Sequence, residues 1–258
     1  MGTLTQNIRK FNRFELKYLI SLQQKEQISH ALNAYLVSDE HGSSKEGYHL
    51  TSLYYDSPDY RCYWEKADGI RFRRKLRIRR YEDGSSLTND TLVFVEIKQR
   101  IDRVTQKRRV LLPYSQAYRL CNDRQIPQHA PCDKDVVEEI YAFAWEYNLK
   151  PTSIVRYQRQ ALVGTDYDIG LRITFDTNLT YQLNPPELQN NHVGLQLLPP
   201  NCVVMEIKVN ERIPYWLTEL VAAFNFNMVR MSKYCHSIEV ANQSCAVPSP
   251  FRHVSITT

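Results

Sequence analysis

The sequence contains no long hydrophobic run. Among its 258 residues, no apolar stretch approaches the roughly 18 residues that a membrane-spanning helix requires. The first residues, Met1–Lys17, lack the apolar core of a secretory signal peptide, and Asn7 stands where an N-myristoylation motif requires Ser or Thr. We therefore expect a cytoplasmic protein whose membrane partner, if it has one, is a separate chain.

Glycine and cysteine are both scarce and scattered. The eight glycines form neither G-x-x-x-x-G-K-[ST] nor G-x-G-x-x-G, which disfavours P-loop, kinase and Rossmann sites. The six cysteines contain no Cys-x-x-Cys pair, and the seven histidines are dispersed. Reduced, mostly structural thiols are therefore expected, and neither a disulfide framework nor a zinc site is supported.

What the chain has in quantity is sequence that alternates between apolar and polar residues. Its composition, 43% hydrophobic and 11% aromatic, is that of a globular protein. The pattern predicts roughly eight strands and four or five helices. Because strands and helices do not alternate regularly along the chain, a doubly wound parallel sheet is disfavoured, and an α+β fold with an antiparallel sheet is expected.

Three of the predicted strands contain a Glu and a Lys separated by one apolar residue. The stretches are RFELKYLI, VFVEIKQR and VVMEIKVN, and the pairs are Glu15 and Lys17, Glu96 and Lys98, and Glu206 and Lys208. Residues two apart in a strand share a face. Each charged pair should therefore project from the side opposite to its apolar neighbours.

Arginine and lysine dominate this polar face on other predicted strands as well. Lys75, for example, shares a face with Arg77 and Arg79. The cations assigned to the face are Lys17, Arg77, Arg79, Lys98, Lys107, Arg109, Arg156, Arg172 and Lys208. These nine cations and the three glutamates together have a net charge of +6, whereas the net charge of the whole chain is +5. A sheet with one solvated face is the simpler interpretation, but bulk solvent does not select Arg and Lys in this way.

Antiparallel strands with converging charged faces can close into a barrel, and about eight strands enclose one small ligand. We therefore predict an eight-stranded antiparallel β-barrel tunnel with a basic lumen, flanked by helices. Such a lumen would be unstable without an anion, because like charges repel strongly at low dielectric. Arg and Lys both match phosphate, so the expected ligand is an elongated polyanion.

The three glutamates admit two interpretations that the residues alone leave open. They can offset neighbouring lysines as ion-pair partners, or they can bind a hard divalent cation such as Mg²⁺ or Mn²⁺. An ion of this kind takes carboxylate and phosphate oxygens together, and it polarises a phosphoryl group during transfer.

Nine short motifs follow one another in an order that resembles the VTC domain. They are FELKY, TSLYYDSPD, KLRIRRY, VFVEIKQR, KRRV, IVRYQR, LRITFD, VMEIK and MSKYCHS, between about Phe11 and Val240. The VTC domain is the catalytic module of the vacuolar transporter chaperone complex, in the triphosphate tunnel metalloenzyme (CYTH-like) superfamily. The resemblance implies one tunnel domain over residues 11–242, between an N-terminal tail (1–10) and a flexible C-terminal tail (243–258).

The resemblance also implies a reaction, namely polyphosphate synthesis from ATP with Mn²⁺ or Mg²⁺ and release of ADP. By motif, the implied catalytic residues are Arg77, Arg79, Lys98, Arg156, Arg172 and Lys208. The implied phosphate-binding residues are Lys17, Lys75, Lys107, Arg109, Ser232 and Lys233. Glu206 would be the principal metal ligand, followed by Glu96 and then Glu15. A stand-alone module of bacterial type is expected, without the SPX domain that senses inositol phosphates.

Three other functions fit parts of the sequence. An inorganic or nucleoside triphosphatase would need the same cations and metal, with water replacing the primer phosphate. A non-catalytic polyphosphate-binding subunit would be expected to lack the metal glutamate or the tunnel arginines, which are present here. Nucleic-acid binding is suggested by the basic, Tyr-rich composition, but inward-pointing charge argues against it. The expected ligands are therefore ATP and polyphosphate or triphosphate, and the sequence does not fix the oligomeric state.

Overall fold

The computed structural model describes residues 13–39, 47–102, 104–165, 168–183, 188, 194–210 and 212–242. The tails predicted at 1–10 and 243–258 lie outside these residues. Within them, no helix is long and apolar enough to cross a membrane.

An eleven-stranded antiparallel sheet forms the body of the structure. The eight long strands are β1 (Arg13–Ser21), β3 (Tyr48–Asp56), β4 (Phe72–Glu82), β5 (Leu92–Ile101), β6 (Val104–Pro113), β7 (Lys150–Gly164), β8 (Arg172–Leu183) and β10 (Cys202–Asn210). The short strands are β2 (Leu36–Ser38), β9 (Leu195–Gln196) and β11 (Asn227–Met228). The hydrogen-bonded order is β11-β1-β10-β8-β7-β3-β4-β5-β6, with β2 on β7 and β9 on β8.

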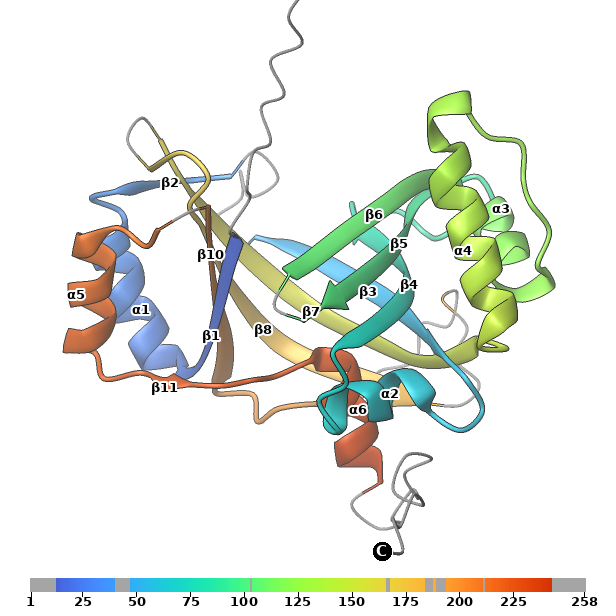
Figure 1. Cartoon of the computed structure of the whole chain (residues 1–258). Helices are drawn as coiled ribbons and strands as arrows, with labels where there is room; N and C mark the ends of the chain where they lie inside the picture. Colours follow the sequence, from blue (N-terminus) through green and yellow to red (C-terminus); the bar gives the residue numbers. More distant parts are fainter. Residues whose placement is uncertain are drawn as a thin grey trace, which may run out of the picture.

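The sheet is curved, but its hydrogen bonding does not close into a barrel (Figure 1). Among the described residues, no ladder joins β6 at one end of the order to β1 or β11 at the other. A side-chain contact instead links the strands next to the two ends, because Lys98 Nζ on β5 lies 3.3 Å from Glu15 Oε2 on β1. The α+β fold and the antiparallel sheet are thus confirmed, whereas the closed eight-stranded barrel is not.

In the described residues, six α-helices pack around the sheet. They are α1 (Leu22–Leu32), α2 (Arg61–Ala67), α3 (Tyr114–Tyr118), α4 (Lys134–Glu146), α5 (Tyr215–Ala223) and α6 (Lys233–Ala241). Two further helical segments, η2 (Arg119–Asp123) and η3 (Pro131–Asp133), lie between α3 and α4. Ser21 caps α1 through a reciprocal capping box with Gln24, which explains why β1 gives way to a helix at this point.

The outer, apolar face of the sheet is covered by two groups of helices. On one side, Ile28 and Leu32 of α1 and Leu217 of α5 pack with outward-facing residues of β1, β8 and β10. On the other side, α3 and α4 cover β4, β5 and β6, where Ile140 and Phe143 enter the core. Burial of these apolar faces leaves the opposite, inner face to hold the charged residues.

Helix α6 packs against the inner face rather than the outer one. Tyr234 stacks on Tyr54 of β3 with ring centroids 5.3 Å apart, and Ile238 joins a core cluster with Val155 and Tyr157 of β7. In Figure 1, α6 lies beside α2 below the sheet. One part of the inner face is therefore apolar and covered, and the rest carries the charges.

Candidate functional site

The strand ladders place the Glu-x-Lys pairs on one face. On β1 and β10, Lys17 lies directly opposite Glu206, and Glu15 lies opposite Lys208. Directly paired residues of antiparallel strands share a face. The two charged pairs therefore form a square of alternating charge on the inner face.

A second set of ladders brings like charges together. On β4, β5 and β6, Lys75 lies opposite Lys98, which lies opposite Lys107. One layer further along, Arg73 lies opposite Arg100. Like charges directly opposite in a sheet destabilise it. This row of cations is therefore suited to a bound polyanion.

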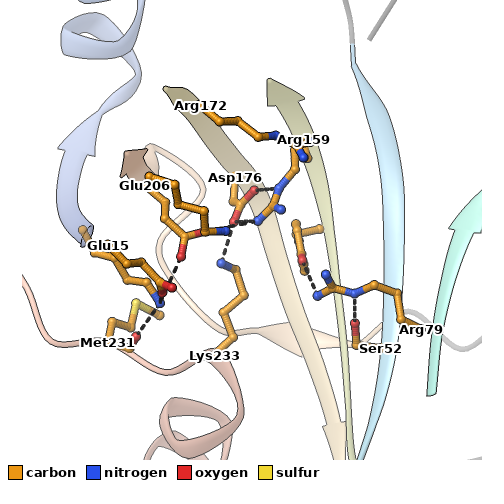
Figure 2. A network of polar contacts seen from close by, with 12 residues as sticks. Glu15, Ser52, Arg79, Arg159, Arg172, Asp176, Glu206, Met231 and Lys233 are labelled. Atoms are coloured by element: carbon orange, nitrogen blue, oxygen red, sulfur yellow. Dashed lines mark hydrogen bonds and ion pairs between the residues drawn. The ribbon is translucent and has the colours of Figure 1, made fainter. Parts of the chain in front are cut away.

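The first carboxylate cluster contains Glu15 and Glu206 (Figure 2). Lys17 Nζ lies 3.0 Å from Glu15 Oε1 and 3.4 Å from Glu206 Oε1, and Lys208 Nζ lies 3.0 Å from Glu206 Oε2. Burial opposes ionisation of Glu206, but Lys208 and Lys17 outweigh it and hold the pKa of Glu206 well below its ordinary value. Burial lowers the pKa of Lys208 to about 8, although Glu206 favours the charged ammonium.

The chemistry of this cluster fits a hard divalent cation. Mg²⁺ is usually bound in proteins through one or two carboxylates together with substrate phosphates. Glu15 and Glu206 supply two carboxylates that already meet at one ammonium group. Thr174, which pairs with Glu206 across the ladder, has a buried hydroxyl without a hydrogen-bond partner among the described residues. Within the residues that the structure describes, no group of three or more His, Cys, Asp or Glu side chains could hold a metal by itself.

Glu96 has a different environment, in which cations surround it. Arg77 donates from Nε to Glu96 Oε2 at 2.7 Å and from Nη1 to the Tyr54 hydroxyl at 3.1 Å, and Lys107 Nζ lies 3.4 Å from Glu96 Oε1. Burial opposes ionisation of Glu96, but Arg77, Arg79 and Lys107 outweigh it and lower its pKa to about 2. Burial likewise opposes ionisation of Tyr54, but Arg77 and Arg79 lower its pKa to about 8.

A buried ion cluster that the sequence analysis did not predict joins β7, β8 and α6 (Figure 2). Arg159 makes two hydrogen bonds to Asp176, from Nε to Oδ1 at 2.6 Å and from Nη2 to Oδ2 at 2.7 Å. Lys233 Nζ lies 2.5 Å from the same Oδ2, and Arg159 Nη2 lies 3.8 Å from Glu206 Oε2. Burial opposes ionisation of Asp176, but Arg159 and Lys233 lower its pKa to about 2. The cluster places Lys233 near Glu206.

Arg156 lies on the outer face, so its predicted place in the basic lumen is wrong. It pairs across the ladder with Thr51, which also pairs with Arg80, and these three side chains line a pocket on the outer face. Alternation along β7 separates two faces but does not say which is inner. The inner face here carries Val155 and Tyr157 under α6 and so resembles an outer face in sequence.

Arg79 and Lys75 lie on the inner face as predicted by alternation. Arg79 donates from Nε to Ser52 Oγ at 3.1 Å and from Nη2 to the Tyr157 hydroxyl at 2.8 Å. Lys75 Nζ donates to Ser232 Oγ at 2.9 Å, at the N-terminus of α6. These contacts bring Ser232 and both cations to the border between the charged and apolar parts of the inner face.

Two further predicted cations lie nearer the edges of the site. The Arg109 guanidinium carbon lies 4.3 Å from the centroid of the Phe94 ring, and Arg109 itself is exposed. Arg172 Nη2 lies 2.6 Å from Asp39 Oδ2 and 3.1 Å from the Tyr48 hydroxyl. Arg172 is therefore on the inner face, opposite Lys208, but these contacts are with Asp39 and Tyr48 rather than with the carboxylates of the two clusters.

Asp176 and Arg159 were not predicted as site residues, and the sequence indicates only the first of them. Asp176 alternates with Arg172, which was assigned to the charged face, so a lone Asp on the same face of that strand was an available signal. Arg159 alternates with Tyr157, and only the packing of α6 shows that this face is the inner one. No feature of the sequence indicates which of the two faces of β7 is the inner one.

Fold and site together define a class of protein. It is an α+β protein whose curved antiparallel sheet presents rows of Arg and Lys on one face, with buried, ionised carboxylates among them. Such a face is suited to an elongated polyanion, and a phosphate chain matches Arg and Lys well.

The family model of the VTC domain matches residues 12–242, and the chain belongs to this family. Membership indicates a function related to polyphosphate or triphosphate. No curated protein sequence matches the chain significantly.

Solved structures with a similar fold have low sequence identity. One is a protein provisionally named an adenylate cyclase from Bacillus halodurans, with 14% identity, a TM-score of 0.49, and coverage of 84% of this chain and 92% of that one. Another, from Vibrio parahaemolyticus and named in the same way, has 11% identity, a TM-score of 0.43, and coverage of 88% and 98%.

Proposed function

We propose that the chain is a metal-dependent polyphosphate polymerase, which transfers the γ-phosphoryl group of ATP to a phosphate chain and releases ADP. The observation on which the proposal rests is the row of Lys75, Lys98 and Lys107, directly opposite one another on three adjacent strands. Without a polyanion these ammonium groups repel one another. Membership of the VTC family supports a phosphate chain as that polyanion.

The shape of the sheet supports a ligand that is elongated. Cations follow β4 on every second residue from Arg73 to Arg79, a track of about 20 Å at the rise of a strand. We propose that the curved sheet acts as the eight-stranded tunnel that the sequence predicts. The contact between Glu15 and Lys98 would then span the opening between its two ends.

Glu206 and Glu15 are the proposed ligands of Mn²⁺ or Mg²⁺. When bound, the ion would polarise the phosphoryl group and offset the charge of its oxygens. Glu96 makes its contacts with Arg77 and Lys107, so its proposed role is to position these cations. Metal binding by Glu206 and positioning of cations by Glu96 both require an ionised carboxylate, in agreement with the lowered pKa of each group.

The cations have separate proposed tasks in the transfer. Arg77, Arg79 and Arg159 would bind the phosphoryl oxygens on which charge accumulates, since planar guanidinium groups match phosphate. The lysines would hold the remaining phosphates of the nucleotide and the growing chain, and these residues are Lys17, Lys75, Lys98, Lys107, Lys208 and Lys233. A terminal phosphate of the chain is itself the nucleophile, so no general base is required.

Incubation of the chain with ATP and Mn²⁺ tests the proposal. Long phosphate chains on a gel, with release of ADP, are the expected result. Orthophosphate without chains would overturn the polymerase and support a triphosphatase in the same site.

Two variants sharpen this experiment. Glu206→Gln should abolish metal-dependent turnover while anion binding is retained, because the substitution removes a metal ligand but no cation. Arg108→Gln is the matched control, because Arg108 lies on the outer face in an ion pair with Glu139 and should leave turnover unchanged.

A further inference from the structure

Lys17 lies between the two glutamates that we assign to the metal, and this inference rests on that proposed function. Its Nζ is 3.0 Å from Glu15 Oε1 and 3.4 Å from Glu206 Oε1. It also donates a hydrogen bond of 3.2 Å to the carbonyl oxygen of Met231 (Figure 2). The ammonium group is thus bound by two carboxylates that belong to adjacent strands.

Three lysines contact the four carboxylate oxygens, and Arg159 Nη2 also lies 3.8 Å from Glu206 Oε2. Glu15 Oε2 faces Lys98 at 3.3 Å, and Glu206 Oε2 faces Lys208 at 3.0 Å. Lys98 and Lys208 each contact one of the two glutamates, whereas Lys17 contacts both through their Oε1 atoms. The position between the carboxylates is therefore occupied by Lys17.

A divalent ion held by both glutamates would need the oxygens that Lys17 now binds. The ammonium group and the ion carry like charge, and at so short a distance their repulsion is large. Binding of the ion therefore requires the Lys17 side chain to move away. Its stem is flexible and anchored on β1, so the ammonium group can change partners without a change in the strand.

The displaced ammonium group needs a new anionic partner. The charged groups that contact the two glutamates include Lys98, Lys208 and Arg159, which are all cations, and the nearby carboxylate of Asp176 is already bound by Arg159 and Lys233. Apart from the carboxylates, its described acceptor is one backbone carbonyl, that of Met231. A phosphate oxygen of a bound chain would supply the missing negative charge.

We propose that Lys17 occupies the place of the divalent ion in the metal-free chain and that a bound phosphate chain draws it away, so that metal and phosphate chain bind cooperatively. Coupling of this kind is reciprocal: each ligand raises the affinity of the other by the same factor. The metal alone would then bind weakly, because it must displace a tethered cation. The metal with a phosphate chain would bind tightly.

Binding of Mn²⁺ alone, followed through the electron paramagnetic resonance signal of the free aqueous ion, is the first test. Lys17→Met should raise the affinity for Mn²⁺ about 10-fold, within the usual range of coupling between two sites. Lys98→Met and Lys208→Met are matched controls, since each removes one charge beside one glutamate. They should raise the affinity by a much smaller factor. An equal gain in all three variants, or none in Lys17→Met, overturns the proposal.

The second test measures coupling with tripolyphosphate, with the complex that it forms with Mn²⁺ in solution counted explicitly. Tripolyphosphate should raise Mn²⁺ affinity in the wild-type chain and much less in Lys17→Met. Lys17→Gln, which is polar and of similar length, provides the same comparison where Lys17→Met does not fold. If Glu206→Gln leaves Mn²⁺ affinity unchanged, the metal site of the proposed function is wrong. If Mn²⁺ affinity depends on Glu206 but not on Lys17, only the proposed exchange of the Lys17 ammonium group for the ion is overturned.

Discussion

Two arginines three residues apart on β7 lie in different environments. Arg159 binds a buried carboxylate on the inner face, and Arg156 lines a pocket on the outer face. Both lie on the same strand and carry the same positive charge, so a comparison between them isolates the effect of the face. They therefore provide a direct test of where the phosphate chain binds.

Replacing Arg159 by Lys should weaken binding of tripolyphosphate about 10-fold, which is close to the loss of one charge-assisted hydrogen bond. Lysine retains the positive charge but lacks the planar guanidinium group that binds Asp176 through two hydrogen bonds and that we propose to bind phosphate. Arg156→Lys, the control, should change the affinity by less than about 2-fold. Isothermal titration calorimetry measures both, and an equal loss in the two variants would contradict the assigned faces.

Tyr54 should ionise at a lower pH than an ordinary tyrosine. Arg77 and Arg79 lower the pKa of its buried phenol to about 8, despite the opposing effect of burial. The ultraviolet absorbance of phenolate should therefore rise near pH 8 in the wild-type chain and not in Tyr54→Phe. Tripolyphosphate should shift this transition to higher pH, because its charge offsets the two guanidinium groups. Identical titrations of the two proteins below pH 9 would refute the prediction.

At the scale of elements, α6 determines how the inner face is divided. Ser232 caps its first turn by accepting from the Cys235 N–H and also accepts from Lys75. The Tyr234 hydroxyl donates to Asp56, which also accepts from the backbone N–H groups of Cys62 and Tyr63 in α2. The helix is therefore joined to α2 and β3 by one buried carboxylate.

Tyr234→Phe should loosen α6 while the sheet remains folded. The substitution removes a hydrogen bond to a buried carboxylate, and the expected loss of stability is about 1–3 kcal/mol. Amide hydrogen exchange should become faster in α6, whereas exchange in α4, on the opposite face of the sheet, serves as the internal control. Unchanged exchange in α6 would show that the contact with Asp56 does not hold the helix.

Strands such as β1, β4, β5 and β10 could be predicted because each alternates between one apolar and one charged face. The same rule located Lys17, Arg77, Glu96 and Glu206, because on their strands the charged face is also the inner face. It failed at β7, where α6 covers part of the inner face with apolar residues. Which face is inner depends there on a helix about 80 residues further along the chain, so local pattern could not decide it.

Local irregularities in the strands were also not predictable. The register between β7 and β8 shifts between Arg156 and Gln158, near Asn178, whose φ of 52° is left-handed. Such a bulge inserts an extra residue into one strand and increases its twist. It contributes to the curvature of the sheet, yet the sequence shows only one Asn among strand residues. Closure of the sheet depends on the sum of such bends, and it could not be deduced from the strand count.

At the scale of the whole molecule, positive and negative charges on the inner face depend on one another. Glu96, Asp176 and Glu206 are buried, and their pKa values are lowered by cations that would otherwise repel each other. Protonation of these carboxylates therefore removes attraction and adds repulsion in one step. Acid should destabilise the fold through this face.

The sign of the effect follows from Glu96, whose pKa is about 2 in the fold against an ordinary value of 4.5. Between these values the unfolded chain binds more protons than the folded one, so stability is complete above about pH 5 and is lost as pH falls towards 2. The contribution of Glu96 is on the order of 3 kcal/mol. In Glu96→Gln this contribution is absent at every pH. Urea denaturation should therefore show a gap in unfolding free energy between wild type and Glu96→Gln that is large at pH 6 and shrinks towards pH 2. A gap that does not change with pH would mean that Glu96 is not ionised among the cations of the inner face.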